Sequence, residues 1–71
     1  MKYIILTKYQ ANRIKGEYGK YSALQPILIL SGEFILPIQV LKEYEFTDVW
    51  DYLRKLPQRE VKKDEFIKSE I

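Results

Sequence analysis

Basic and aromatic side chains alternate in the first third of this sequence, between residues 8 and 21. The set consists of Lys8, Tyr9, Arg13, Lys15, Tyr18, Lys20 and Tyr21. Cationic side chains can neutralise a phosphate backbone while neighbouring rings stack on unpaired bases, as in proteins that bind single strands. This spacing therefore indicates a candidate nucleic-acid contact. Tyrosine rings also commonly cap the rim of a small core while nearby bases remain solvated, and we prefer this structural interpretation.

The chain lacks the side chains that most enzymes use near neutral pH. It contains no histidine and no cysteine, which removes the usual general acid or base, the thiolate nucleophile and the usual zinc ligands. Neither a Gly-x-Ser-x-Gly nor a Ser-x-x-Lys motif surrounds the three serines, Ser22, Ser31 and Ser69. The acidic pairs Asp48/Asp51 and Asp64/Glu65 do not match a calcium-loop spacing. We therefore expect no enzymatic activity, no cofactor and no metal site.

Length and composition indicate one small folded domain, residues 1–71. Hydrophobic residues make up 46% and aromatic residues 14% of the chain, which excludes a disordered protein. The absence of cysteine excludes disulfides and favours a reducing, cytoplasmic location. The apolar N-terminal run ends at Lys8, too early for a signal peptide, and no apolar stretch is long enough to predict a membrane span. A formal charge of +2 is too small to require a polyanionic partner.

The longest apolar stretch, residues 24–41, predicts the centre of the fold. Its two apolar runs flank Ser31-Gly32-Glu33, which is typical of a β-hairpin, and we expect the hairpin to span residues 24–37. A two-residue turn at Ser31-Gly32 would place Leu28 opposite Ile35. One face would then carry Ile27, Ile29, Phe34 and Leu36, and the other would carry Leu28, Leu30 and Ile35. Because both faces are apolar, each of them requires a cover.

The segments around this hairpin predict an α+β fold, an antiparallel sheet with short helices packed on one face. Residues 3–7 have the composition of a strand, and we place it beside the hairpin. Residues 8–22 are expected to form mainly a long loop, although residues 11–15 also fit a helical turn or a short strand. Apolar spacing predicts helices over residues 38–44 and 48–56, the second capped by Thr47. Residues 62–71 fit a frayed tail, although Val61 can add an edge strand and Phe66 and Ile67 a short helix.

The two apolar hairpin faces lead to the functional expectation. Two short helices can cover one face, and a second copy of the chain can cover the other. We therefore expect a non-enzymatic protein-interaction module that self-associates, a homodimer, with Leu28, Leu30 and Ile35 at the partner interface. A small nucleic-acid-binding accessory protein that uses the basic and aromatic residues 8–21 is the alternative.

Overall fold

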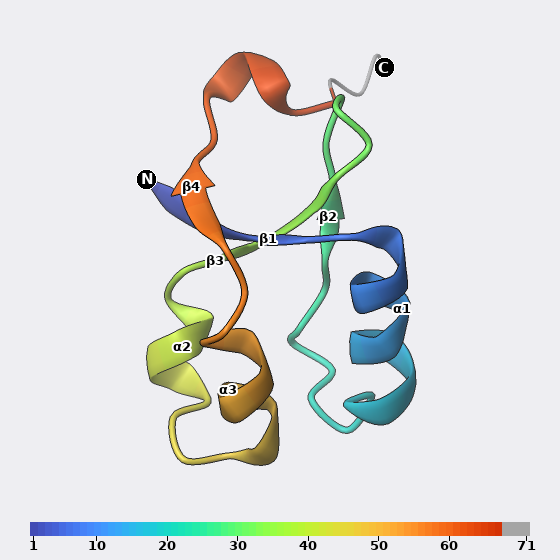
Figure 1. Ribbon diagram of the computed structural model, residues 1–71, viewed down its shortest axis with the longest axis vertical. Coiled ribbons are helices and arrows are strands. Elements are labelled where there is room, and N and C mark those ends of the chain that lie inside the picture. The colour runs from blue at the N-terminus through green and yellow to red at the C-terminus, as the bar shows by residue number, and fades with distance from the viewer. Residues whose placement is uncertain (68–71) are drawn as a thin grey trace.

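A computed structural model describes residues 1–67 and shows a four-stranded antiparallel sheet with strand order β2-β3-β1-β4 (Figure 1). In chain order the elements are β1 (Lys2–Leu6), α1 (Lys8–Glu17), β2 (Ile27–Leu28), β3 (Phe34–Pro37), α2 (Val40–Glu43), α3 (Asp48–Leu53), β4 (Gln58–Glu60) and the single-turn 3-10 helix η1 (Lys63–Glu65). Together they form a small α+β domain, which confirms the fold class expected from the sequence.

The N-terminal strand β1 occupies the middle of the sheet. It pairs with β3 on one side, with Ile4 opposite Leu36, and with β4 on the other, with Ile4 opposite Gln58. Ile4 and Leu6 face one side of the sheet and Ile5 faces the other, and all three are buried. The strand predicted beside the hairpin is therefore confirmed, and its alternating apolar residues supply both faces of the sheet.

Helix α1 occupies most of the segment that we expected to be a loop. Thr7 caps it, because the Thr7 hydroxyl accepts from the Gln10 amide at 3.2 Å and the Gln10 side chain accepts from the Thr7 amide at 2.9 Å. Ala11 and Ile14, three residues apart, bury one side of the helix. The prediction of a loop is therefore wrong over residues 8–17, and of the alternatives for residues 11–15 the structure shows the helix.

The two predicted C-terminal helices are present but shorter than expected. The helix predicted over residues 38–44 covers Val40–Glu43, and the helix predicted over residues 48–56 covers Asp48–Leu53. The Thr47 hydroxyl accepts from the Trp50 amide at 3.3 Å, as a helix cap does, and Val49 and Leu53 are buried. The cap and the buried stripe were therefore predicted correctly, and only the helix ends differ.

The hairpin has a different register from the predicted one. Its turn contains three residues, 30–32, because the Ile29 amide donates to the Glu33 carbonyl at 3.0 Å and the Gly32 amide donates to the Ile29 carbonyl at 2.9 Å. Gly32 has a φ of 90°, which glycine adopts without steric cost. Ile27 consequently lies opposite Ile35, and Leu28 lies opposite Phe34. A shift of one residue changes which hairpin residues share a face, so the predicted faces are wrong.

Buried residues form two clusters, one on each side of the sheet. The helix-side cluster lies between the sheet and the helices and contains Ile4, Leu6, Ile14, Leu24, Leu36, Val40, Val49 and Leu53. The second cluster contains Ile5, Ile29, Ile35 and Val61, with Tyr3 and Phe66 packed against it. Two layers of side chains therefore cover one sheet, as its two apolar faces require.

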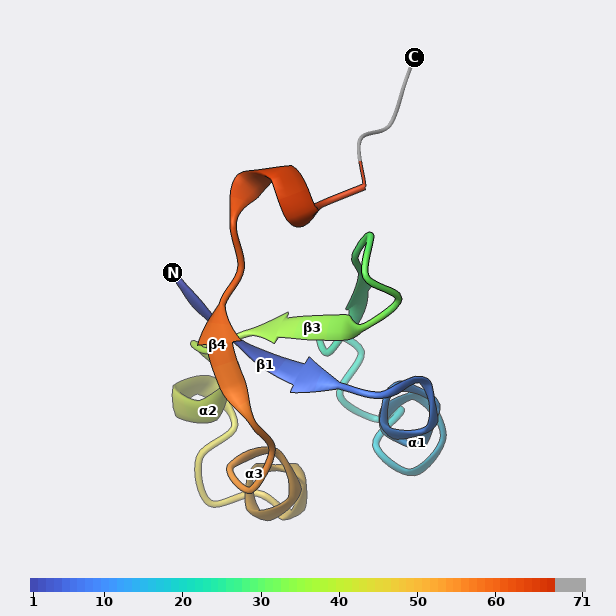
Figure 2. The same cartoon turned by 45° about the horizontal axis from the view of Figure 1, so that its top comes forward.

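The second cluster is covered by the chain itself. The segment after β4, residues 61–67, crosses this face, and we call it the C-terminal strap (Figure 2). Phe66 forms an isolated antiparallel bridge with Ile29 and packs edge-on against Tyr3 at 5.8 Å between ring centroids. We expected a second copy of the chain to cover this face, and that expectation is wrong, because the strap of the same chain covers it. Residues 62–67 of the predicted frayed tail have a defined conformation, and residues 68–71 lie outside the described residues.

Candidate functional site

Four exposed aliphatic residues gather along the outer edge of β2. Ile27, Leu28, Leu30 and Ile67 are between 41% and 66% exposed, whereas aliphatic residues of the sheet interior are buried. Ile29 bridges Phe66, and this register places Ile67 beside Leu28. We call these four residues the edge patch. Alternation along β2 places Ile27 on the face of Ile35, and Leu28 with Ile67 on the opposite face, so the patch extends around the edge of the sheet. Large exposed aliphatic side chains that are close to one another, rather than isolated, mark surfaces that contact other molecules.

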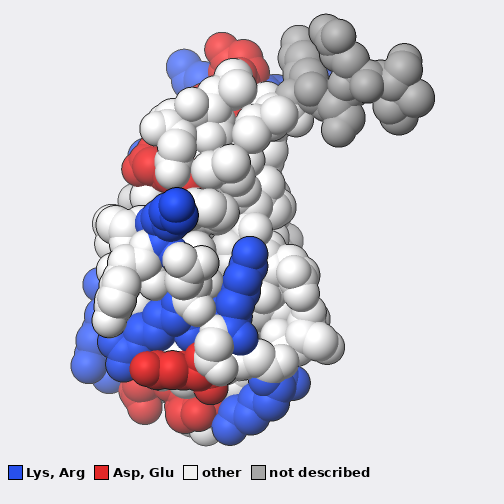
Figure 3. All heavy atoms as spheres, turned by 90° about the vertical axis from the view of Figure 1, so that its right-hand side faces the viewer, with Lys and Arg blue, Asp and Glu red and all other residues white. Residues whose placement is uncertain are grey.

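The hairpin segment that contributes Ile27, Leu28 and Leu30 to the edge patch carries no charged residue. Residues 21–32 contain no Lys, Arg, Asp or Glu. Figure 3 views the side on which α1 and β2 lie and shows an area without charged groups on its right-hand part, with basic and acidic side chains below it and along the left and upper margins. Edge strands usually carry charged residues that prevent contact with other strands. Residues 21–32 carry no charge of this kind.

The structure separates the three residues predicted at the partner interface. Leu28 and Leu30 lie in the edge patch, but Ile35 has no exposed surface and lies in the second cluster beside Ile5. The shift in hairpin register is the physical reason, because it places Ile35 on the face of Ile27 and Ile29 instead of the face of Leu28. Ile35 therefore cannot contact a partner while the C-terminal strap is in place.

The basic and aromatic set from residues 8–21 is also divided. Arg13 forms an ion pair with Glu17 at 2.9 Å and lies over the Tyr52 ring at 4.9 Å from its centroid. Lys20 forms an ion pair with Asp48 at 3.3 Å. Both cations therefore have internal partners, which raise the pKa of Arg13 and of Lys20 chiefly through hydrogen bonds to these carboxylates.

Two of the three tyrosines in this set pack against the helix-side cluster. Tyr18 lies 5.9 Å from Tyr52, and Tyr21 lies 5.1 Å from Tyr44, between ring centroids. The Tyr21 hydroxyl donates to the Asp48 carboxylate at 2.7 Å, and this bond is the main reason that the pKa of Asp48 is lowered. These rings therefore lie at the margin of the core, whereas Lys8, Tyr9 and Lys15 are exposed on α1.

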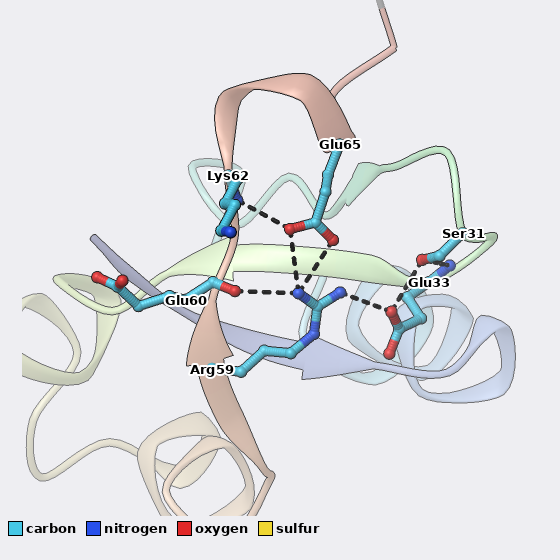
Figure 4. Close-up of polar contacts among 6 residues, drawn as sticks. All are labelled: Ser31, Glu33, Arg59, Glu60, Lys62 and Glu65. Carbon is cyan, nitrogen blue, oxygen red and sulfur yellow. Dashed lines mark hydrogen bonds and ion pairs between the residues drawn. The ribbon is translucent and has the colours of Figure 1, made fainter.

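Arg59 of β4 connects the hairpin turn to the C-terminal strap (Figure 4). Its Nη2 atom lies 2.8 Å from Glu33 Oε1, and its Nη1 atom lies 3.0 Å from Glu65 Oε1. Ser31 donates its hydroxyl to Glu33 at 2.8 Å, and the Lys62 amide donates to Glu65 at 2.8 Å. We call Ser31, Glu33, Arg59 and Glu65 the Arg59 cluster, and it fixes the strap above the sheet.

The hydrogen bonds of the Arg59 cluster favour the charged form of each carboxyl group. Arg59 and then Ser31 lower the pKa of Glu33, whereas the Lys62 amide, assisted by Arg59, lowers the pKa of Glu65. Glu33 is the one charged residue between positions 21 and 41, a signal in the sequence that it needs a cation. This cluster was not predicted from the sequence, because no pattern near Glu33 or Arg59 indicates that these two residues, 26 positions apart, form an ion pair.

Acid should weaken the fold through these carboxylates. Their pKa values are lower in the folded protein than in the unfolded chain, so they stabilise the fold above the ordinary pKa of about 4.5. That contribution is lost as the pH falls through the lowered values. We therefore expect the urea midpoint to decline below about pH 4.5. An Arg59→Met variant should show a shallower decline, and an equal slope in both proteins would contradict this role of the cluster.

A groove of about 500 Å³ lies beside the Arg59 cluster, between the hairpin turn, the start of α1 and Pro57. Ile5 and Leu6 contribute apolar lining, and Lys8 and Glu33 are the charged residues that line it. Within residues 1–67, no three acidic side chains are placed to hold a metal ion. In the same part of the chain, no helix is long and apolar enough to cross a membrane.

Comparisons with protein-family models, with curated proteins and with solved structures found no match to this chain. Of the surfaces described above, the edge patch combines exposed aliphatic side chains, an edge strand and a hairpin segment, residues 21–32, without charged residues.

Proposed function

We propose that this protein is a non-enzymatic, cytoplasmic protein-interaction module that self-associates through the edge patch. The exposure of Ile27, Leu28, Leu30 and Ile67 on one uncharged edge is the observation that supports the proposal. Burial of such side chains is the main driving force of protein association. The surface differs from the one expected from the sequence, because Ile35 is replaced by Ile27 and Ile67.

A second copy of the chain is the partner that this surface fits. In a two-fold dimer each residue near the axis faces its own copy, so a charged residue there would be repelled by an identical charge. Residues 21–32 carry no charge, and this obstacle is absent at the edge of β2. A neutral aliphatic surface is therefore complementary to itself.

Side-chain packing, rather than a continuous sheet across both copies, is the contact that this edge allows. Because Ile29 bonds to Glu33, the neighbouring Leu28 directs its backbone groups away from β3. Pro26 has no amide hydrogen, and the Leu30 amide already donates to the Glu65 carbonyl at 2.9 Å. Apart from Leu28, this edge therefore offers few backbone N–H and C=O groups with which a partner strand could form hydrogen bonds.

The expected dimer is weak. Half-exposed aliphatic side chains gain about 1 kcal/mol each when they are buried, and two edge patches contribute eight of them. Association costs about 4–15 kcal/mol in lost freedom of movement. The balance is at best about −4 kcal/mol, which corresponds to a dissociation constant in the millimolar range or weaker.

Leu28→Glu should abolish the dimer and leave the monomer folded. Leu28 is 43% exposed, so a glutamate there remains solvated in the monomer but faces its own copy in the dimer. Light scattering across a concentration series should give a dimer mass for the native protein and a monomer mass for the variant. Phe46→Glu, at an exposed position outside the edge patch, is the matched control and should still dimerise. A native protein that stays monomeric, or a variant that dimerises equally well, would refute the proposal.

Nucleic-acid binding through α1 is the alternative proposal. Exposed Tyr9 between Lys8 and Lys15 is the observation that favours it, because a free ring beside cations can stack on a base. The same light-scattering series, repeated with a mixed-sequence oligonucleotide, distinguishes the two functions. A mass that rises only with oligonucleotide at low salt would support nucleic-acid binding instead of self-association.

A further inference from the structure

The C-terminal strap forms its own small packing unit on one face of the sheet. Val61, the first residue of the strap, is buried, Phe66 packs on Tyr3, and the Glu65 carbonyl accepts from the Leu30 amide. These contacts join the strap to the second cluster and to the hairpin turn. The three helices lie on the opposite side of the sheet (Figure 2).

The sheet separates the strap from most of the buried core. Ile35 and Leu36 are neighbours in β3, yet Ile35 lies in the second cluster and Leu36 lies in the helix-side cluster. Removal of the strap would therefore uncover Ile35 and leave the packing around Leu36 in place. Units of this kind open at a lower free energy than the whole fold.

The polar contacts that hold the strap are partly exposed to solvent. The side chains of Arg59, Glu33 and Glu65 are 37%, 40% and 30% exposed, so water and salt weaken their ion pairs. Regular structure contributes little, because the strap contains only the single turn η1. Arg59 is nevertheless placed to control the strap, since it holds both the strap and the hairpin turn.

We propose that the C-terminal strap opens and closes as a unit, that Arg59 is its latch, and that closure completes the edge patch. The last part rests on the proposed function. When the strap is closed, Ile67 lies beside Leu28. When it opens, Ile67 leaves the patch and the apolar face around Ile35 is uncovered.

Two single-cysteine variants at neighbouring positions test the opening. The chain has no cysteine of its own, so Ile35→Cys and Leu36→Cys each introduce one buried thiol, on opposite faces of β3. We expect a thiol reagent to label the Ile35→Cys variant at least about tenfold faster, because strap opening uncovers only that face. Labelling is done on dilute protein, where association does not contribute.

The latch is tested by adding Arg59→Met to each cysteine variant. This substitution keeps an unbranched side chain and removes the ion pairs, so labelling at position 35 should accelerate about fivefold while labelling at position 36 stays unchanged. Equal labelling rates at the two positions would show that only global unfolding exposes them, and would overturn the proposal that the strap opens as a unit. If Arg59→Met leaves the labelling rate at position 35 unchanged, Arg59 does not hold the strap closed. Ile29→Cys, buried in the same cluster, repeats the measurement if Ile35→Cys does not fold.

The connection with the edge patch is tested by light scattering. Ile29→Cys with Phe66→Cys joins the two bridged positions and locks the strap when it is oxidised. We expect the oxidised protein to dimerise at least as tightly as the native chain, and Arg59→Met to dimerise several-fold more weakly. If the native chain, the oxidised variant and Arg59→Met all dimerise equally, closure of the strap does not contribute to the edge patch, although the strap can still open. A native monomer would refute the proposed function, whatever the labelling rates are.

Discussion

Replacement of Ile35 by alanine should destabilise the protein by about 3 kcal/mol, a large share of what so small a domain can have. Ile35 has no exposed surface and packs between Ile5, Ile29 and Val61. Its truncation removes three buried carbon atoms and leaves a cavity that the twisted sheet cannot close. Urea unfolding followed by circular dichroism would measure the change in the free energy of unfolding.

Leu28→Ala is the matched control for this prediction. Leu28 is also an aliphatic residue of the hairpin and lies in β2, the strand paired with β3, but it is 43% exposed. Its truncation in dilute, monomeric protein should therefore cost less than about 1 kcal/mol. Equal losses for the two variants would mean that Ile35 and Leu28 share an environment, as the register predicted from the sequence requires.

Replacement of Ile14 by alanine should cost about 3 kcal/mol as well, because α1 is part of the core. Ile14 is 1% exposed and lies in the helix-side cluster together with Leu6 and Leu24. A residue in a surface loop would lose almost nothing on the same substitution. Thermal unfolding would measure this loss of stability. A large loss is expected if residues 8–17 form a helix packed on the core, and almost none if they form a loop.

Asn12→Ala provides the control on the same helix. Asn12 is exposed, and alanine is the better helix former by a few tenths of a kcal/mol, so this variant should be as stable as the native protein or slightly more stable. A destabilising effect similar to that of Ile14→Ala would indicate that the substitutions act through something other than burial.

Local patterns predicted the parts of the fold that depend on few residues. The composition of residues 3–7 indicated the strand β1, and the hydroxyl of Thr47 marked the start of α3. Helix α1 was missed because its buried side consists of Ala11 and Ile14 alone, too little for a clear apolar period. The signal that could have found it is the pair Thr7 and Gln10, which has the spacing of a capping box.

Distant contacts could not be predicted in the same way. The hairpin register depends on whether two or three residues form the turn, and a single residue reverses the faces. Arg59 meets Glu33 across 26 positions of the chain, and no local pattern joins them. The edge patch was found in part, through Leu28 and Leu30, whereas Ile67 joins it only because Phe66 bridges Ile29.

The central place of β1 has a consequence for how the chain folds during synthesis. β1 leaves the ribosome before its partners β3 and β4, and Lys2 of β1 pairs with Glu60 of β4, far along the chain. The sheet therefore closes through long-range contacts, which raise contact order and slow folding relative to a helical chain of equal length. Until β4 emerges, the apolar nascent strand Tyr3–Leu6 lacks one of its two neighbours, and this interval is when the chain is most exposed to aggregation.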